Sequence, residues 1–362
     1  MRIALVAPLY ESVPPARYGG TERVVSWIAE ELVRRGHDVT LFAAGDSTTS
    51  ATLVPMCDRN LRQEAPRTDG NALHAAALLA AIRQRPAFDV IHSHIDWVGV
   101  ALAQAFGNSG APIVSTLHGR LDIPEAQAVI AAAPDAGLIS ISDAQRAPIA
   151  RANWLGTVRH GLPIGAPFVR TPEDYFAFVG RISRDKRPDL AIRAACAAGV
   201  RLRIAAKVNG NDDDAEYFRN EIEPLIASSA GRVEFAGEIS DDEKPAFMGK
   251  ARALLFPIDW PEPFGLVAIE AMSFGTPVIA RPFGALPEIV EEGKTGFLVD
   301  TVDEMVAAIR AVDSLERAHS FAAVRARFSV TRMVDDYEAI YARVAARVPR
   351  SAKSWTGSRF AG

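Results

Sequence analysis

Short runs of apolar residues alternate along nearly the whole chain with stretches in which apolar residues recur every three or four positions. Ile3–Pro8 is the first run, and its length predicts a buried strand. Thr21 is a predicted N-cap, and apolar residues recur after it at helical spacing from Val24 to Leu32. Asp38–Phe42 then predicts a second strand. The N-terminal residues therefore predict a strand–helix–strand unit with parallel strands.

The same alternation continues through the first half of the chain. An Ala- and Leu-rich stretch, Ala72–Arg83, predicts a helix between strands. Strands alternating with helices are typical of a parallel sheet with helices on both faces. The further strands predicted here are Val90–His92, Ile113–Thr116 and Leu138–Ile141.

The pattern stops at Leu162–Phe168 and restarts after it. This stretch contains Pro163, Gly165 and Pro167, which predicts a linker. Pro188–Gly199 and a short stretch near Ala268–Phe274 predict helices in the second half. The predicted strands there are Tyr175–Val179, Arg201–Ala206, Val233–Phe235, Ala253–Phe256, Pro277–Ala280 and Gly296–Val299.

We therefore predict an α/β chain of two Rossmann-like domains, because its length of 362 residues exceeds what one ordinary core accommodates. The first domain spans residues 1–165 and the second spans 170–333. A helical stretch at 334–349 is expected to cross back to the first domain. Residues 351–362 have the composition of a disordered tail.

Composition narrows the function classes. The net charge of −4 provides no basic field for nucleic acid. The two cysteines, Cys57 and Cys196, fall in different predicted domains, so a disulfide framework or a cysteine zinc site is not expected. The N-terminus lacks signal-peptide character, and no apolar run approaches the roughly 20 residues of a membrane helix. We expect a cytoplasmic protein and leave peripheral membrane contact and the oligomeric state open.

The most informative segment runs from Pro261 to Glu270 and carries two glutamates, Glu262 and Glu270, that are separated by seven residues. Glu262 lies on a Pro/Gly loop after a predicted strand, and Glu270 lies in the following helix. Free backbone N–H groups at the start of that helix favour an anion, and Gly265 allows a ligand to approach the backbone closely. Two glutamates at this spacing could also be one helix cap and one solvated side chain.

This segment resembles the E-x7-E signature of the family 4 retaining glycosyltransferases, which have the GT-B fold. The resemblance extends over nearly the whole chain. Its other segments are Gly19-Gly20, Thr116-Leu117-His118-Gly119, Phe178-Val179-Gly180-Arg181 with Lys186, and Phe283-Gly284-Ala285-Leu286-Pro287-Glu288. It implies two Rossmann-like domains that face each other across a cleft. It also implies that Glu262 and the backbone of Phe264, Gly265, Leu266 and Val267 orient the transferred sugar, while Glu270 holds the ribose.

Arg181 and Lys186 lie five residues apart after a predicted strand end. A departing nucleoside diphosphate gains negative charge, which fixed cations stabilise in the transition state. The resemblance implies that this pair binds the diphosphate in place of a metal ion, with Lys207 as a further cation. Without the resemblance, both side chains could simply be solvated loop cations.

Other candidate residues follow predicted strands, where α/β sheets bind ligands. Gly19 and Gly20 form the first such turn, which could also be a bare Gly-Gly turn. In similar enzymes a histidine in the place of His118 lies near the transferred sugar. The resemblance further implies that the loop Gly237-Glu238-Ile239 contacts the nucleotide base.

Two segments resemble metal-binding motifs. His92-Ser93-His94-Ile95-Asp96 places two imidazoles two residues apart, but no further ligand cluster is near in sequence. Asp212-Asp213-Asp214 follows Asn209-Gly210-Asn211 and is more typical of a polar turn. We expect neither a metal nor a cofactor, and we interpret His160-Gly161 as a turn.

The function that we predict is a metal-independent retaining hexosyltransferase of carbohydrate biosynthesis. Its donor would be a UDP-, GDP- or ADP-linked sugar and its acceptor a carbohydrate, a lipid-linked or a small molecule. An epimerase or hydrolase on the same fold would need an acid/base pair around the sugar ring, which the sequence does not present. A catalytically silent binding protein would not require the set Arg181, Lys186, Glu262 and Glu270.

Overall fold

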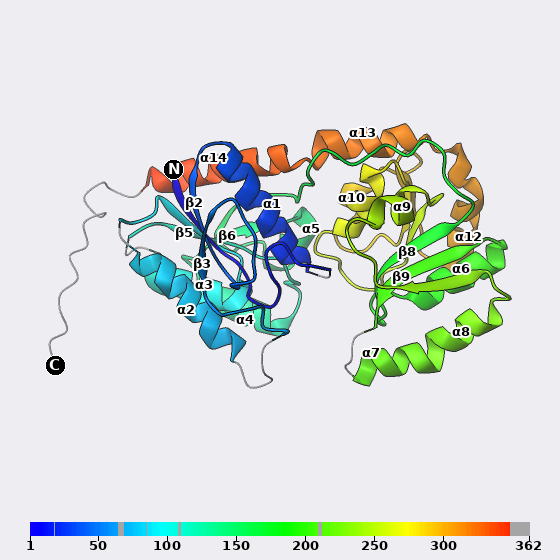
Figure 1. The fold of residues 1–362 in the computed structure, drawn as a ribbon, viewed down its shortest axis with the longest axis horizontal. Coiled ribbons are helices and arrows are strands. Elements are labelled where there is room, and N and C mark those ends of the chain that lie inside the picture. The colour runs from blue at the N-terminus through cyan, green and yellow to red at the C-terminus, as the bar shows by residue number, and fades with distance from the viewer. Residues whose placement is uncertain (18, 64–68, 85, 108–109, 209–211, 348–362) are drawn as a thin grey trace. The chain divides into compact units, whose positions relative to one another are not determined.

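The computed structural model describes residues 1–17, 19–63, 69–84, 86–107, 110–208 and 212–347, which form two compact units (Figure 1). Of the described residues, unit 1 comprises those within 1–160 and 330–347, and unit 2 comprises those within Gly161–Ser329. The predicted tail at 351–362 and the turn Asn209-Gly210-Asn211 lie outside the described residues.

Unit 1 contains a parallel sheet with the strand order β3-β2-β1-β4-β5-β6-β7. Its central strands are buried along almost their whole length, because helices cover both faces of the sheet. The strands are β1 (Arg2–Val6), β2 (Asp38–Ala43), β3 (Thr52–Pro55), β4 (Val90–Ser93), β5 (Ile113–Thr116), β6 (Gly137–Ser140) and β7 (Trp154–Thr157). The helices are α1 (Gly20–Arg34), α2 (Gly70–Arg83), α3 (Asp96–Phe106), α4 (Pro124–Ala131), α5 (Asp143–Arg146), η1 (Ala147–Ile149) and α14 (Val330–Ala345).

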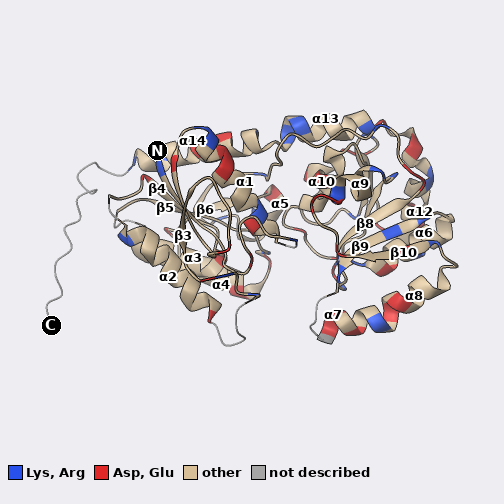
Figure 2. Cartoon of the chain, in the orientation of Figure 1, with Lys and Arg blue, Asp and Glu red and all other residues tan. Residues whose placement is uncertain are grey.

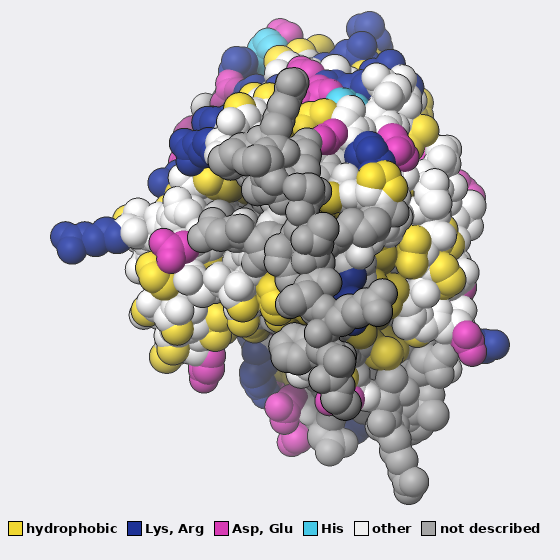
Figure 3. All heavy atoms as spheres, turned by 90° about the vertical axis from the view of Figure 1, so that its left-hand side faces the viewer, with side chains coloured by type: hydrophobic (Ala, Val, Ile, Leu, Met, Phe, Trp, Pro, Cys, Tyr) yellow, Lys and Arg dark blue, Asp and Glu magenta, His cyan; other side chains and the backbone are white. Residues whose placement is uncertain are grey.

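Helices α2 and α3 carry few charged side chains, as Figure 2 shows. They contact each other, and Trp97, Val98 and Leu102 of α3 pack against the core of unit 1. Figure 3 looks onto one face of the molecule, where the apolar side chains in view lie in small groups among polar and charged ones. Among the described residues, no helix combines the length and the apolar character that crossing a bilayer requires.

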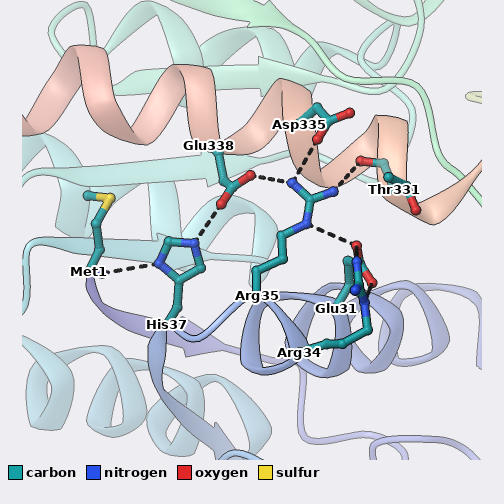
Figure 4. Close-up of polar contacts among 8 residues, drawn as sticks. All are labelled: Met1, Glu31, Arg34, Arg35, His37, Thr331, Asp335 and Glu338. Carbon is teal, nitrogen blue, oxygen red and sulfur yellow. Dashed lines mark hydrogen bonds and ion pairs between the residues drawn. The ribbon is translucent and has the colours of Figure 1, made fainter.

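The C-terminal helix α14 packs on unit 1, as the sequence predicts, but begins at Val330 rather than near residue 334. Tyr337 and Tyr341 are fully buried on its inner side. Figure 4 shows a polar anchor at the end of α1, where Arg35 contacts Asp335 (2.7 Å), Glu338 and the carbonyl of Thr331 (2.8 Å). Apolar packing and this ion-pair network together hold α14 on a unit from which it is distant in sequence.

Unit 2 repeats the architecture with a parallel sheet in the order β10-β9-β8-β11-β12-β13. Its core is built from the inner faces of these strands and from α6 and α12. The strands are β8 (Phe176–Arg181), β9 (Leu202–Lys207), β10 (Val233–Gly237), β11 (Leu254–Phe256), β12 (Val278–Ala280) and β13 (Gly296–Leu298). The helices are α6 (Pro188–Ala198), α7 (Asp212–Tyr217), η2 (Phe218–Ile222), α8 (Glu223–Ser228), α9 (Lys244–Gly249), α10 (Leu266–Ser273), α11 (Leu286–Ile289), α12 (Val302–Ala311), η3 (Val312–Ser314) and α13 (Arg317–Arg327).

The prediction of two parallel-sheet α/β domains is confirmed. Every strand that the sequence predicts is present, with ends that differ by no more than two residues. Sequence analysis missed β3 and β7, the outer strands of the sheet in unit 1. Both are only partly buried, so neither has the continuous apolar run by which the inner strands are recognised.

Candidate active site

The loop between β11 and α10 presents backbone donors to a ligand. Gly265 caps α10 with φ +99° and ψ +53°, a left-handed conformation that residues with a Cβ rarely adopt. Within the described residues, the N–H groups of Leu266 and Val267 at the start of α10 have no hydrogen-bond partner. The N-terminus of an α-helix carries a partial positive charge, so these two groups can bind an anion or a sugar oxygen.

Lys186 and Glu262 meet beside this helix end. Lys186 follows β8 in a turn where its N–H donates to the carbonyl of Ser183 (3.1 Å). Its Nζ lies 2.6 Å from Oε2 of Glu262, and the two side chains are only 15% and 12% exposed. Trp260 also donates its Nε1–H to that oxygen (3.0 Å), and its ring lies 4.6 Å from the ammonium. Among the described residues Oε1 of Glu262 has no partner, so it can accept from a bound hydroxyl.

The segment Phe283-Gly284-Ala285 fixes the backbone of Glu262 from the other side. The N–H of Ala285 donates to the carbonyl of Glu262 (2.9 Å). Gly284 has φ +58°, and a Cβ at this position would lie 2.2 Å from the carbonyl oxygen of Glu262. This close approach explains why a glycine stands here and makes the second loop a support for the first.

Arg181 and Lys207 end two neighbouring strands, β8 and β9, and are direct partners in the parallel register. Arg181 contacts Asp185 through Nη2 (3.3 Å), while its buried Nε has no hydrogen-bond partner among the described residues. A buried guanidinium donor without a partner is costly, and an anion placed there would satisfy it. The pair thus brings a second group of positive charge to the carboxyl edge of this sheet.

Glu270 lies one turn into α10 and pairs with a residue that sequence analysis missed. Its Oε1 is 2.8 Å from Nζ of Lys244, and both side chains are largely buried. Lys244 opens α9, a few residues after the predicted base-contacting loop Gly237-Glu238-Ile239, of which Gly237 ends β10. No motif marked Lys244 in the sequence. A lysine at the start of a helix, after three acidic residues, looks like ordinary surface charge.

In unit 1, His118 follows β5 and is part of a column of imidazole rings. Its Nε2 lies 2.9 Å from Nδ1 of His94, and its ring stacks on that of His160 with centroids 5.3 Å apart. His160 is therefore a packed, buried residue beside His118, which corrects its interpretation as only a turn. The backbone N–H of His118 donates to Oδ1 of Asp96 (3.1 Å).

Burial keeps these imidazoles neutral. It lowers the pKa of His118 to about 3, and burial, with a smaller contribution from nearby His118, lowers the pKa of His92 to about 3. The pKa values of His94 and His160 fall well below the usual value, chiefly through burial. Burial acts in the opposite direction on Asp96 and raises its pKa to about 6, although the N–H of His118 partly offsets this.

Gly19 and Gly20 form the start of α1, with Gly19 as N-cap. The neighbouring Glu22, which sequence analysis did not single out, is buried in the first turn of this helix. Burial, reinforced by the negative charge of Glu11, raises the pKa of Glu22 to about 7. A buried carboxyl group thus lies next to the Gly-Gly turn. Glu11 itself pairs with Arg62.

The two segments that imitate metal sites have other contacts. The nitrogens of His92 contact Tyr341 (2.6 Å) and Thr116 (2.7 Å), and Nδ1 of His94 contacts His118. Asp212–Tyr217 forms α7 rather than a turn. Among the described residues, no three His, Cys, Asp or Glu side chains gather as a metal-binding group.

The structure therefore brings Lys186 together with Glu262, Arg181 together with Lys207, and Glu270 together with Lys244, all within unit 2. Gly265, Leu266 and Val267 lie at the same loop as Glu262, and Phe264 is buried beneath it. His118, Gly19 and Gly20 belong to unit 1.

Comparison with known families matches both units. Residues 166–327 match the model for glycosyl transferases group 1, and residues 18–155 match the model for glycosyltransferase family 4. The chain is 27% identical over 409 aligned positions to D-inositol 3-phosphate glycosyltransferase of Mycolicibacterium smegmatis, with 94% of this chain and 91% of that protein covered.

Solved structures share the fold. Sucrose-phosphate synthase from Thermosynechococcus elongatus superimposes with a TM-score of 0.79 at 21% identity, covering 96% of this chain and 99% of that one. HepE from Anabaena, solved in complex with UDP-glucose, superimposes with a TM-score of 0.72 at 20% identity, covering 95% and 100%. Both units thus share the GT-B fold of these two structures.

Proposed function

Since this chain is a glycosyltransferase built from a family 4 domain and a group 1 domain, we propose that it is a retaining, metal-independent enzyme. It transfers a hexose from a nucleotide-diphosphate sugar to an acceptor hydroxyl. Unit 2 holds the donor, and unit 1 binds the acceptor. The observation that carries this proposal is the contact of Lys186 with Glu262 beside the open N–H groups of α10.

The leaving diphosphate is stabilised by positive charge from the chain itself. Lys186 provides an ammonium. Arg181 provides a guanidinium whose buried Nε has no hydrogen-bond partner among the described residues. The start of α10 adds two N–H donors. Groups that are already fixed where negative charge develops are worth far more in a partly buried site than in water. These groups can do the work for which other transferases use a divalent cation.

The acidic residues position the donor. Oε1 of Glu262 accepts from a hydroxyl of the transferred sugar, while Oε2 stays with Lys186 and Trp260. Glu270, fixed by Lys244, accepts from the ribose hydroxyls with its second oxygen. Gly237, Glu238 and Ile239 contact the base. Holding the donor at several points keeps its anomeric carbon in the geometry required for attack.

Retention is proposed to follow a front-face displacement. The acceptor hydroxyl attacks the anomeric carbon on the side from which the diphosphate leaves. The bond from this carbon to the phosphate oxygen breaks, the acceptor oxygen forms the new bond, and its proton passes to the departing phosphate. His118, which is neutral because it is buried, lies in unit 1 and supports the positive sugar centre without adding charge.

Donor and acceptor identities are narrower proposals. A neighbour in fold was solved with UDP-glucose, which makes UDP-sugars the first donors to test, before GDP-, ADP- and dTDP-sugars. The acceptor is a carbohydrate, a lipid-linked or a small molecule. The cytoplasmic location stays a prediction of the sequence.

Donor sugars are screened first by thermal shift, since a ligand specific for the folded state raises its apparent stability by about 2.7 kcal/mol at 100 times its Kd. Transfer from the best donor is then followed by release of nucleoside diphosphate, with and without EDTA. We expect EDTA to leave the rate unchanged and NMR to show a product with the anomeric configuration of the donor. Glu262→Gln should retain donor binding and lose turnover. An inverted product, an isomerised donor or full dependence on a divalent cation would contradict the proposal.

A further inference from the structure

The ring of His118 is held from two sides, which leaves one nitrogen for a ligand. His94 contacts Nε2 (2.9 Å), and the ring of His160 lies parallel to within 16° at 5.3 Å. Within the described chain, Nδ1 of His118 has no hydrogen-bond partner. Whether this nitrogen donates or accepts depends on which ring nitrogen carries the proton in the neutral imidazole.

His94 is closed in on every side. His94 is only 1% exposed, and its ring centroid lies 3.9 Å from that of His92. His92 has no free nitrogen to offer His94, because both of its nitrogens are already hydrogen-bonded to Tyr341 and Thr116. Among the described residues, Nε2 of His94 is buried without a hydrogen-bond partner.

The unpartnered Nε2 of His94 determines the direction of the hydrogen bond between His94 and His118. If His118 donated to Nδ1 of His94, the proton of neutral His94 would be on Nε2, as a buried N–H with no acceptor. If His94 donates instead, Nε2 carries only a lone pair. An orphaned buried donor is rarer in proteins than an under-satisfied acceptor, so the second arrangement has the lower energy. Nε2 of His118 then accepts, and its proton lies on Nδ1.

We propose that His94 is a positioning residue that holds His118 in the Nδ1–H tautomer and thereby makes it a neutral hydrogen-bond donor toward an oxygen of the bound substrate. This inference rests on the proposed function for the identity of that substrate. The tautomer itself does not depend on it, since it follows from contacts within unit 1.

The tautomer of His118 matters because the imidazole rings of this column are neutral. Burial lowers the pKa of His118 to about 3 and that of His94 well below the usual value, so neither ring gains a second proton near neutral pH. A doubly protonated imidazole donates from both nitrogens whatever its neighbour does. A neutral imidazole has a single N–H, and only its partner can fix on which nitrogen it lies.

The test uses the full-length protein with 15N-labelled histidine and reads the tautomer of His118 by long-range 15N–1H NMR, its signal assigned by its loss in His118→Gln. In the wild type we expect the proton on Nδ1. His94→Asn offers an amide N–H close to the position of Nδ1 and should keep that tautomer. His94→Phe keeps a ring but has no donor and should give a mixture. A proton on Nε2 in the wild type, or an unchanged tautomer in His94→Phe, overturns the inference.

Kinetics with the best donor provide the second readout. Because only molecules with the correct tautomer and ring orientation are competent, His94→Phe should lower kcat by about three- to tenfold, and His94→Asn should restore most of it. Equal loss in both variants would indicate a structural role and overturn the positioning role. If the wild type transfers no sugar at all, the proposed function fails, while the NMR measurement still decides the tautomer.

Discussion

The ammonium of Lys186 lies 2.6 Å from the carboxylate of Glu262, although the two residues are 76 positions apart in the chain. The contact joins the loop after β8 to the loop after β11, whose strands are neighbours in the sheet of unit 2. It is the point at which the positive and negative groups of the proposed donor site meet. The ammonium of Lys186 has three N–H donors, so it can bind a phosphate oxygen of the donor while it keeps its contact with Glu262.

Alanine at Gly284, in the loop that supports Glu262, should be costlier than alanine at Gly293, which lies outside that loop. Gly284→Ala places a Cβ 2.2 Å from the carbonyl oxygen of Glu262, while Gly293→Ala, also at positive φ, meets no atom within 4 Å. We expect Gly293→Ala to lower the free energy of unfolding by about 1–2 kcal/mol and Gly284→Ala by about 3 kcal/mol or more. Urea denaturation measures both. Equal losses would show that backbone conformation alone matters.

Lys244→Ala should weaken donor binding without slowing the chemical step. It removes the partner that fixes Glu270 at 2.8 Å, and a lost charge-assisted hydrogen bond is worth about 1–2 kcal/mol. KM for the donor should rise about five- to thirtyfold with kcat nearly unchanged, as expected for an interaction present in both ground and transition states. Lys250→Ala, which removes an exposed pair with Glu173, is the control. A fall in kcat with constant KM would place Lys244 in the chemistry instead.

The docking of α14 should depend on Arg35 and not on its neighbour Arg34. Arg35 contacts Glu31, Asp335, Glu338 and Thr331 (Figure 4). Arg34 is exposed, and among the described residues its one ion-pair partner is Glu31. Arg35→Ala should lower the free energy of unfolding by about 1–2 kcal/mol and increase hydrogen exchange in α14. Arg34→Ala should change neither, as is usual for an exposed pair. Matching losses in the two variants would contradict this assignment.

Acid should destabilise unit 1 through its buried histidines. The folded pKa of His92 is about 3 against 6.5 for the free side chain, so its contribution is complete above pH 6.5 and is lost as the pH falls toward 3. Each such histidine adds a slope of up to about 1.4 kcal/mol per pH unit in this window. Asp96 and Glu22, with pKa values raised to about 6 and about 7, act in the opposite direction.

The contribution of one histidine is therefore measured as a difference between variants. His92→Gln should reduce the slope of unfolding free energy between pH 6.5 and pH 4.5, whereas His319→Gln, which alters an exposed side chain, should leave it unchanged. Urea midpoints at several pH values give both slopes. An identical slope in wild type and His92→Gln would show that His92 is protonated in the folded protein.

The sequence predicts the repeated parallel architecture well because inner strands of such sheets are continuous apolar runs. It predicts the Glu262–Glu270 segment for a different reason, namely the fixed spacing of a loop followed by a helix. It could not predict the partners of these residues. Lys244 reaches Glu270 through tertiary packing, and nothing in its local sequence distinguishes it from a surface residue. Trp260 reaches Glu262 from two residues earlier in the same loop, where no motif marks it.

The imidazole column shows the same limit. His92 and His94 are recognisable in sequence as a pair that resembles metal ligands, and the sequence argues against a metal site without showing what contacts them instead. The hydroxyl groups that engage the two nitrogens of His92, those of Thr116 and Tyr341, come from another strand and from the C-terminal helix. Only the fold shows that burial and ring contacts occupy these histidines.

The most direct test of the donor site is the binding of nucleoside diphosphates to the full-length protein by isothermal titration calorimetry. UDP, GDP, ADP and dTDP are titrated into the wild type, Lys186→Ala and Arg184→Ala, since Arg184 lies on the same loop but is 69% exposed. We predict that at least one nucleotide binds the wild type and Arg184→Ala equally, and binds Lys186→Ala about tenfold more weakly or worse. Equal affinity for wild type and Lys186→Ala would contradict the account.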